Sequence, residues 1–362
     1  IDYVVHTGDI VNVEDTQSQW VDAKAAFDIL DNAGIKYALA AGNHEYPAAG
    51  GKHRDSTVFN ETFPFANYFG EGSTYVGGYY EEGKMDNVYH FATIGSKTYI
   101  ILALENFPRQ AIVDWAKQVV AANPQYPVIV ATHTYLNTNG SINTTNNTHT
   151  GFTGAVAEER GIKPTELYDQ FISQYANIQL VLCGHMACDD IITRVDIGVN
   201  GNKITTIMND PSYAGDGGAG LVALYRFKAD GTIKVEYYSP FKNAYYRDSN
   251  QFTFDPENAP MYVDISGLTE MNNDKYADNA TWTKPGLYLP WVQWGSTTIY
   301  GNDAVIRKWT TDTAFTDKVL KITYLKDKVD NQAEFAVLDT NGKILYGYTD
   351  LSTTSLAIDI PI

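Results

Sequence analysis

The chain has 362 residues, and 26 Lys and Arg against 43 Asp and Glu give it a net charge of −17. Such a length exceeds a single typical core, so we expect two domains. The acidic balance argues against nucleic acid as a partner, because phosphate backbones are bound by basic surfaces. No apolar run approaches about 18 residues, so we expect no membrane span.

Strand and helix patterns alternate up to about residue 185. Four short β-branched runs, each followed by a turn, predict buried strands, and they cover 1–9, 35–45, 128–133 and 178–185. Apolar residues at helical spacing predict three helices, at 15–34, 109–122 and 165–175. The alternation predicts an α/β fold, in which ligands bind in the crevice beyond the carboxyl ends of the strands.

A hairpin and two loops are predicted in the remaining parts of this half. Residues 88–94 and 99–104 flank a Gly-Ser-Lys turn and predict a hairpin. Residues 47–83 and 137–154 look like loops that follow ligand strands. Both either rim the site or form variable surface.

Beyond residue 185 the pattern changes to hairpins. Asn-Gly and Asp-Gly turns join 191–199 to 203–208 and 220–227 to 232–238. The composition breaks at Asp-Pro-Glu-Asn-Ala-Pro around residue 255, and the rest has short strand patterns, many aromatic residues and no convincing helix. We therefore predict one domain at 1–256 and an all-β sandwich module, Ig-like or carbohydrate-binding-like, at 259–362.

Composition also bears on partners and location. The tryptophans of the second module could line a glycan-binding face, although packing in an aromatic core explains them as well; they include Trp282, Trp291, Trp294 and Trp309. The chain is rich in Tyr, Asn, Thr and Gly and has Asn-x-Ser/Thr triplets, at Asn60, Asn143, Asn146 and Asn279. We expect a secreted or cell-surface protein.

Each of the four predicted strands ends in a residue that can bind a metal. These residues are Asp9, Asn43, His133 and His185. A single Gly-Asp or a single histidine would be weak evidence, because a lone histidine is more often a satisfied core residue. Together, a carboxylate, an amide oxygen and two imidazoles at strand ends suit a divalent transition metal used for hydrolysis.

Three further residues are candidate catalytic groups. His44 follows Asn43 and could act as a general acid, with Glu45 near enough to orient it. Arg194 follows the Gly-His turn on a strand and could clamp a phosphate through two hydrogen bonds. A surface ion pair explains Arg194 equally well.

These motifs resemble the calcineurin-like metallophosphoesterase superfamily, which includes purple acid phosphatases and many phosphodiesterases. The likeness covers roughly residues 1–256 and rests on Gly8-Asp9, the run Gly-Asn-His-Glu at 42–45, the strand ending in His133, and Gly184-His185. It implies a metallophosphoesterase fold, in which two packed mixed β-sheets are flanked by helices. It also implies two transition metals, Mn, Fe or Zn, in one site.

The resemblance further implies a role for each matching residue. Asp9 would bridge the two metals, while Asn43, His133 and His185 would complete the ligands of the second metal. His44 would protonate the leaving oxygen or steady the phosphoryl group. A metal-bound hydroxide would then hydrolyse a small phosphomonoester or phosphodiester.

The chain departs from the family pattern at two points. The Asp-x-His strand that should precede Asp9 is absent, and Ile1 enters directly into a strand. We therefore expect an N-terminally truncated domain whose first strand is missing and whose activity is weak or absent. Ala187 stands where the family has a second histidine, and alanine cannot bind a metal. Only the second metal site is expected to be complete in this chain.

A narrower likeness is to secreted bacterial members with extra β-modules. It rests on residues 5–9, 131–133 and 209–210, and in that group the last motif also lacks its second histidine. The contrasting hypothesis is a non-catalytic surface protein. Its metal site would be degenerate, and its β-module would bind a glycan or a partner.

Overall fold

The chain divides into two units, Ile1–Ala259 and Pro260–Ile362. In this computed structural model the described residues are 1–47, 54–145, 160–212, 214 and 217–257, and in the second unit only the backbone of seven strands. The first unit holds all the predicted site residues.

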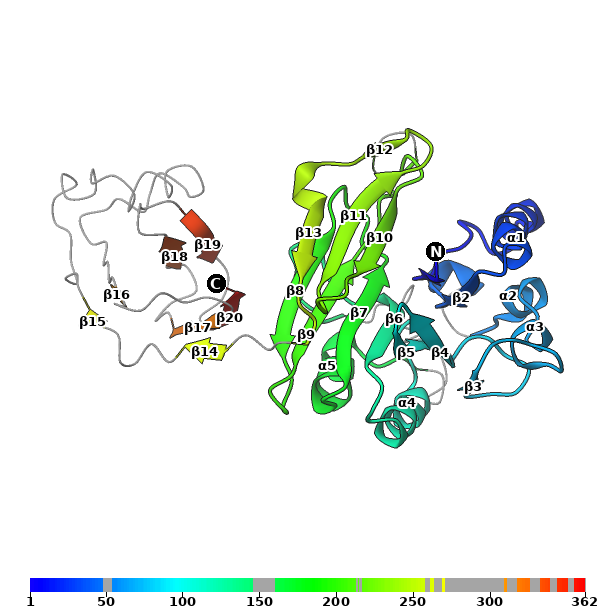
Figure 1. Cartoon of the computed structure of the whole chain (residues 1–362), viewed down its shortest axis with the longest axis horizontal. Helices are drawn as coiled ribbons and strands as arrows, with labels where there is room; N and C mark the ends of the chain where they lie inside the picture. The colour runs from blue at the N-terminus through cyan, green and yellow to red at the C-terminus, as the bar shows by residue number, and fades with distance from the viewer. Residues whose placement is uncertain are drawn as a thin grey trace. The chain divides into compact units, whose positions relative to one another are not determined.

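A seven-stranded mixed sheet forms the centre of the first unit, in the order β3-β4-β5-β6-β7-β9-β8 (Figure 1). Its strands are β3 Gly77–Tyr79, β4 Val88–Ile94, β5 Lys97–Ala103, β6 Val128–Thr134, β7 Ile178–Gly184, β8 Ile192–Ile197 and β9 Lys203–Met208. Neighbours β5, β6, β7 and β9 run parallel, so their carboxyl ends share one edge. Every residue of β6 is buried, as expected for a strand covered on both faces.

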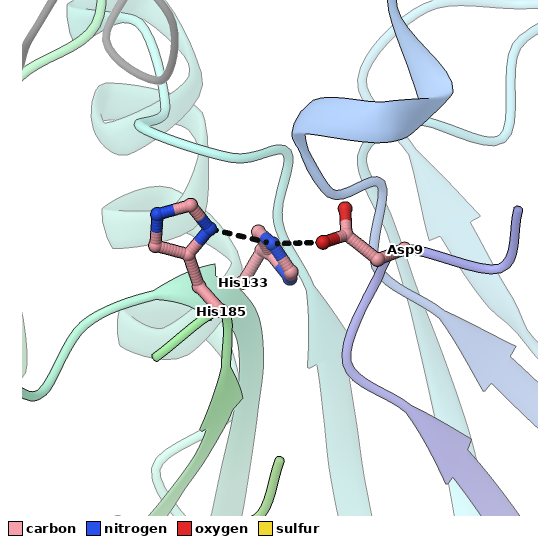
Figure 2. A group of neighbouring side chains, drawn as sticks. All are labelled: Asp9, His133 and His185. Atoms are coloured by element: carbon pink, nitrogen blue, oxygen red, sulfur yellow. Dashed lines mark hydrogen bonds and ion pairs between the residues drawn. The ribbon is translucent and has the colours of Figure 1, made fainter. Parts of the chain in front are cut away.

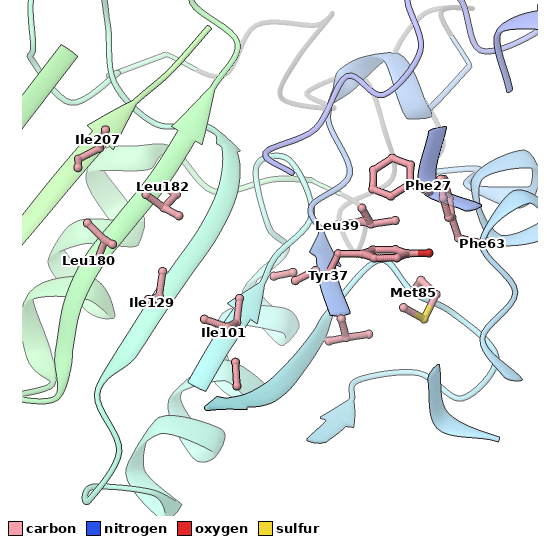
Figure 3. Close-up of a cluster of buried hydrophobic side chains, with 14 of the residues drawn as sticks. Phe27, Tyr37, Leu39, Phe63, Met85, Ile101, Ile129, Leu180, Leu182 and Ile207 are labelled. Atoms are coloured by element: carbon pink, nitrogen blue, oxygen red, sulfur yellow. The ribbon is translucent and has the colours of Figure 1, made fainter. Parts of the chain in front are cut away.

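Side chains alternate between two cores, one on each face of this sheet. Helices α4 Gln110–Ala122 and α5 Pro164–Gln170, with the short 3-10 helix η3 Ile172–Gln174, cover one face. Ile100, Val130 and Val181 point into that core. Their neighbours Ile101, Ile129 and Leu180 point into the opposite core, which Figure 3 shows.

A β-α-β unit begins the chain. Strands β1 Tyr3–His6 and β2 Lys36–Leu39 pair in parallel, and helix α1 Gln17–Asn32 connects them. The helix buries Trp20 and Phe27, and the Phe27 ring lies 4.9 Å from that of Tyr37 on β2. Because His6 pairs with Leu39, both strands end at the same level. The 3-10 helix η1 Asn43–Glu45 follows β2.

An antiparallel sheet completes the first unit, with strands β10 Val222–Phe227, β11 Ile233–Ser239, β12 Ala244–Tyr245 and β13 Gln251–Phe254, and the 3-10 helix η4 Asp248–Asn250 between the last two. Val235 and Tyr237 of β11 lie in the same core as Ile207 of β9. The predicted α/β fold with a large mixed sheet flanked by helices is therefore confirmed, whereas the second sheet, predicted to be mixed, is antiparallel.

The predicted helices at 15–34, 109–122 and 165–175 are confirmed as α1, α4 and α5 with η3. The loop predicted for 47–83 is wrong in its described part, which contains α2 Thr57–Thr62, α3 Ala66–Phe69 and β3. Burial of Phe59, Phe63 and Tyr68 stabilises these short helices. This burial outweighs the glycine-rich composition from which a loop was predicted. Most of the other predicted loop, residues 146–159, lies outside the described residues.

The second unit is described only as strands: β14 Met261–Val263, β15 Thr269–Glu270, β16 Trp309–Thr310, β17 Lys318–Leu325, β18 Ala333–Leu338, β19 Ile344–Asp350 and β20 Ser355–Pro361. They pair as β14-β17-β20, β15-β16 and β18-β19. Its assignment as a sandwich stays a prediction, and Trp282, Trp291 and Trp294 lie outside the described residues. Across both units, no described helix is long and apolar enough to cross a membrane.

Candidate metal centre

The strand ends bring three predicted ligands together. Asp9 lies in the turn after β1, His133 near the end of β6 and His185 directly after β7. Their ligand atoms all lie within 4.8 Å of one another (Figure 2). The arrangement follows from parallel strands that end at one edge.

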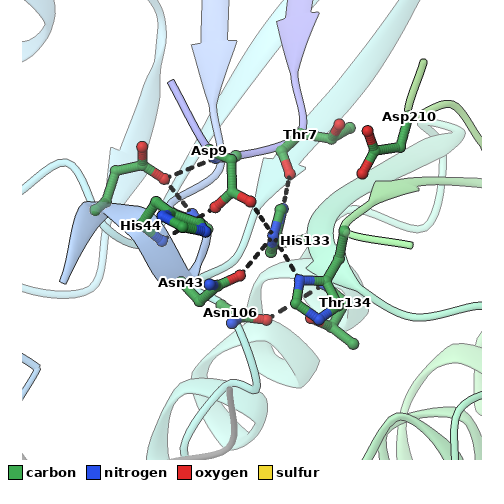
Figure 4. A network of polar contacts seen from close by, with 12 residues as sticks. Thr7, Asp9, Asn43, His44, Asn106, His133, Thr134 and Asp210 are labelled. Atoms are coloured by element: carbon green, nitrogen blue, oxygen red, sulfur yellow. Dashed lines mark hydrogen bonds and ion pairs between the residues drawn. The ribbon is translucent and has the colours of Figure 1, made fainter. Parts of the chain in front are cut away.

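His133 is the centre of the group, and it is 1% exposed. Its Nδ1 donates a hydrogen bond to the carbonyl of Thr7 at 2.8 Å. Its Nε2 therefore faces Asp9 Oδ2, Asn43 Oδ1 and His185 Nδ1, each at 3.1 Å (Figure 4). The fourth predicted ligand, Asn43, thus also reaches the site.

This donor set fits a metal ion. With the proton on Nδ1, a neutral His133 presents a lone pair at Nε2 towards a carboxylate oxygen and an amide oxygen that can only accept. A proton on Nε2 could point to one of these atoms, whereas a cation attracts all of them. Nitrogen and oxygen ligands with one carboxylate suit a divalent transition metal.

The electrostatics keep the charged ligand ionised. Burial opposes ionisation of Asp9, but its interaction with His133 and the backbone N–H of His44 outweigh burial and hold the pKa of Asp9 at about 2. Burial also disfavours the charged form of His133, yet the carboxylate of Asp9 raises the pKa of that imidazole overall. Asp9 is therefore a carboxylate at any physiological pH.

The backbone is strained at two of the candidate ligands. Asp9 has φ 54° and His185 has φ 73°, a left-handed conformation that L-residues rarely adopt. Such positions cost on the order of 1–3 kcal/mol and persist where the surrounding structure holds them, often at functional sites. The fold therefore holds the backbone of both residues in this conformation, which their local sequence preference would not favour.

The glycines of the two loop motifs are required by close packing. A Cβ on Gly8, which has φ +99°, would lie 2.7 Å from the backbone of Gly42 and from His133 Nδ1. A Cβ on Gly42 would lie 2.3 Å from Asp9 Oδ1. The loops that carry Asp9 and Asn43 can touch only because both positions lack a side chain.

Glu45 holds the turn of Asp9, and its role in orienting His44 stays a prediction. Its carboxylate accepts four backbone hydrogen bonds, from Gly42, Asp9, Ile10 and Val11, at 2.6, 2.8, 2.6 and 3.3 Å. Burial and the nearby charge of Asp9 raise the pKa of Glu45 to about 7 despite these donors. Glu45 is thus a positioning residue that ties the Asp9 turn to η1.

His44 is oriented by the main chain. Its Nδ1 donates to the carbonyl of Asn12 at 2.6 Å, and its own backbone N–H donates to Asp9 Oδ1 at 3.1 Å. The hydrogen bond to Asn12 fixes which ring nitrogen faces the main chain. The ring is partly exposed, as a proton donor to a substrate must be.

Arg194 is engaged in an ion pair, and its role as a phosphate clamp stays a prediction. Its guanidinium donates two hydrogen bonds to Asp196, at 2.7 and 2.6 Å, and a longer one to the carbonyl of Gly140. Residues i and i+2 of a strand share a face, so β8 itself brings the two side chains together. The ion-pair alternative left open by the sequence is the one the structure has.

Asn106 is a site residue that the sequence analysis missed. It is fully buried, and its backbone N–H donates to the carbonyl of Ala41 at 2.9 Å. Its side-chain Oδ1 accepts from the backbone N–H of Thr134 at 3.3 Å (Figure 4). Because Ala41 precedes Gly42-Asn43 and Thr134 follows His133, Asn106 links the segments that carry two of the candidate ligands.

A buried charge network fixes Asn106 in turn. Arg54 donates to the carbonyls of Asn106 and Phe107 at 2.8 and 2.6 Å. The neighbouring Glu105 is bound by Arg109 at 2.8 and 3.0 Å and by Asn87 at 2.9 Å. The sequence held a usable signal, because polar Glu105-Asn106 directly follows the apolar run of β5 at the same sheet edge.

Packed mixed sheets with outer helices, and an Asp, Asn and His set at the strand ends, define a metallophosphoesterase. The model of the calcineurin-like phosphoesterase family matches residues 1–189, and the chain belongs to this family. It is also similar to the uncharacterized protein YvnB of Bacillus subtilis (strain 168), with 27% identity over 262 residues. That alignment covers 70% of this chain and 18% of YvnB, so the chain spans less than a fifth of its relative. Family membership supports metal-dependent phosphoester hydrolysis in general.

Proposed function

We propose that the chain hydrolyses a small phosphomonoester or phosphodiester at a centre of two transition-metal ions, Mn, Fe or Zn. Asp9, Asn43, His133 and His185 would hold one of them. One observation carries the proposal: Nε2 of His133 lies 3.1 Å from a donor atom of each of the other three. Acceptor atoms that converge on one point favour a cation at that point.

Each residue has a defined task in this proposal. A bound divalent cation would polarise the phosphoryl oxygens and lower the pKa of a water molecule. Asp9 supplies the negative charge that holds the cation, and Thr7 keeps the proton of His133 on Nδ1 so that Nε2 faces the site. His44, held through Nδ1, would give a proton from Nε2 to the leaving oxygen.

Asp9→Asn tests the proposal with little disturbance of the fold. Asparagine tolerates the left-handed backbone of this position, so the substitution removes the charge and keeps the turn. Asp189→Asn is a matched control, because Asp189 is an exposed carboxylate near the same sheet edge that pairs with Arg247. We expect Asp9→Asn to weaken Mn²⁺ binding at least about tenfold and the control to leave it unchanged.

Metal analysis is run beside an assay with mono- and diester aryl phosphates. Hydrolysis that requires added Mn²⁺, Fe²⁺ or Zn²⁺ and is lost in Asp9→Asn supports the proposal. Equal metal binding by wild type and Asp9→Asn would refute it. Bound metal without turnover of either ester would favour the non-catalytic alternative, a surface protein with a degenerate site.

Two further proposals, on the location of the protein and on binding by the second unit, are inferred from composition. We infer from composition that the protein is secreted or displayed at the cell surface, and that the second unit contacts a glycan through its aromatic residues. A pull-down of the full chain on insoluble polysaccharides would test the second point. Equal retention on an uncharged polymer resin would contradict it.

A further inference from the structure

The strand next to β7 ends in two oxygen-bearing side chains, Asn209 and Asp210, which lie outside the set of predicted ligands. β9 runs parallel to β7, and Met208 pairs with Cys183. Asn209 and Asp210 therefore leave the sheet at the same edge and level as Gly184 and His185. The backbone N–H of Asn209 donates to the carbonyl of Cys183 at 3.0 Å, which continues the pairing by one residue.

The two turns are packed around each other. After His185 the chain bends back, and the N–H of Cys188 donates to the carbonyl of Asp210 at 2.8 Å. A Cβ built on Gly184 would lie 3.1 Å from the hydroxyl of Thr7 and 3.8 Å from the carbonyl oxygen of Asn209. The end of β7 at Gly184 thus lies near both the turn of Asn209 and the segment that leads into Asp9. Figure 4 shows Asp210 across Thr7 and His133 from Asn43 and His44.

Both side chains have oxygen atoms to spare. Asp210 Oδ1 accepts hydrogen bonds from the N–H of Ser212 at 3.2 Å and from its hydroxyl, which orients the carboxylate. Within the part of the chain that the structure describes, no hydrogen bond reaches Asp210 Oδ2. Asn209 Oδ1 is buried and has no hydrogen-bond partner among the described residues. A buried acceptor without a donor indicates an ion or a water molecule at that place.

We propose that Asp210 and Asn209 supply oxygen ligands for a second cation beside His185. The inference rests on the proposed function, since this cation would serve the same centre. It would occupy the side on which Ala187 stands in place of an imidazole. Carboxylate and amide oxygens are hard ligands, so this position favours Mn²⁺ or Mg²⁺ over Zn²⁺.

The competing explanation is that Asp210 only caps the turn at Pro211-Ser212, and two substitutions separate the roles. Asp210→Asn keeps an oxygen that can accept from Ser212 but removes the charge. Ser212→Ala removes the hydroxyl donor and leaves the carboxylate. A ligand role predicts an effect of the first substitution, whereas a capping role predicts an effect of the second.

The test is a titration of the full chain with Mn²⁺. Binding is measured by calorimetry and by the electron paramagnetic resonance signal of the Mn²⁺ that stays free. We expect two Mn²⁺ per wild-type chain and per Ser212→Ala chain. Asp210→Asn should keep one ion with unchanged affinity and bind the other at least about tenfold more weakly. Asn209→Ala should weaken the same ion, which gives a second readout if Asp210→Asn does not fold.

The possible failures are distinguishable. Two ions at wild-type affinity in both Asp210→Asn and Asn209→Ala would overturn the inference. Loss of the ion in Ser212→Ala but not in Asp210→Asn would reduce Asp210 to a turn cap. One ion in the wild type would overturn the inference and the second metal of the proposed centre, while metal-dependent hydrolysis at the ligands around His133 would still stand. No bound Mn²⁺ in the wild type would overturn both.

Discussion

Asn106→Ala should weaken metal binding although Asn106 is not a candidate ligand. The substitution keeps the backbone bond to Ala41 and removes the side-chain acceptor of the Thr134 N–H. A buried donor left without a partner costs about 1–3 kcal/mol, so the apoprotein should lose unfolding free energy of that order. The segment after His133 is then no longer tied to the segment before Asn43.

The effect on the metal follows from this lost constraint. Removing outer contacts of metal ligands typically lowers affinity about 10–100-fold, which corresponds to about 1.4–2.7 kcal/mol. We expect a change in Kd for Mn²⁺ within this range in a calorimetric titration. Chemical denaturation of the apoprotein measures the stability loss separately.

Asn177→Ala is the matched control. Asn177 directly precedes β7, at the end of the strand opposite to His185, and its side chain donates to the carbonyls of Asn123 and Tyr126, each at 3.1 Å. The substitution should destabilise the fold by a similar amount and leave the Kd for Mn²⁺ unchanged. The reasoning is refuted if Asn106→Ala binds Mn²⁺ like the wild type, or if Asn177→Ala weakens binding equally.

Four further outcomes are expected. His44→Ala should lower turnover about 10²–10⁴-fold while metal stays bound; unchanged turnover would remove His44 from the mechanism. Gly8→Ala should destabilise the chain and weaken metal binding, whereas Gly34→Ala, with φ +68° and no atom within 4 Å of the added Cβ, should cost only about 1–2 kcal/mol; equal effects of the two would contradict the packing argument. Arg194→Ala should change kcat and KM for an aryl phosphate less than about threefold, because its guanidinium is already paired with Asp196, and a large rise in KM would support the phosphate clamp. Burial, with the charge of Lys36, lowers the pKa of His90 to about 3 from 6.5, so its neutral form contributes stability above pH 6.5 that is lost as pH falls towards 3; denaturation should show a shallower pH dependence in His90→Gln, and identical profiles would refute this.

The sequence by itself determined the layout of the first unit. Continuous β-branched runs and helical spacing depend only on which faces of an element are buried, so most of the strands and the helices α1, α4 and α5 could be predicted. The predicted ligands could be found because each stands where an apolar run stops. Parallel strands that share an edge then bring such positions together without further information.

Only the tertiary structure decided which partner each polar side chain has. Glu45 binds the Asp9 turn, Arg194 binds Asp196, and Asn106 joins segments that are far apart in the sequence. The pairing of β9 with β7, which brings Asn209 and Asp210 to the same sheet edge as Gly184 and His185, likewise could not be predicted from the hairpin pattern. A sequence pattern reports burial along one element, whereas a hydrogen bond depends on the distance between elements, which packing alone sets.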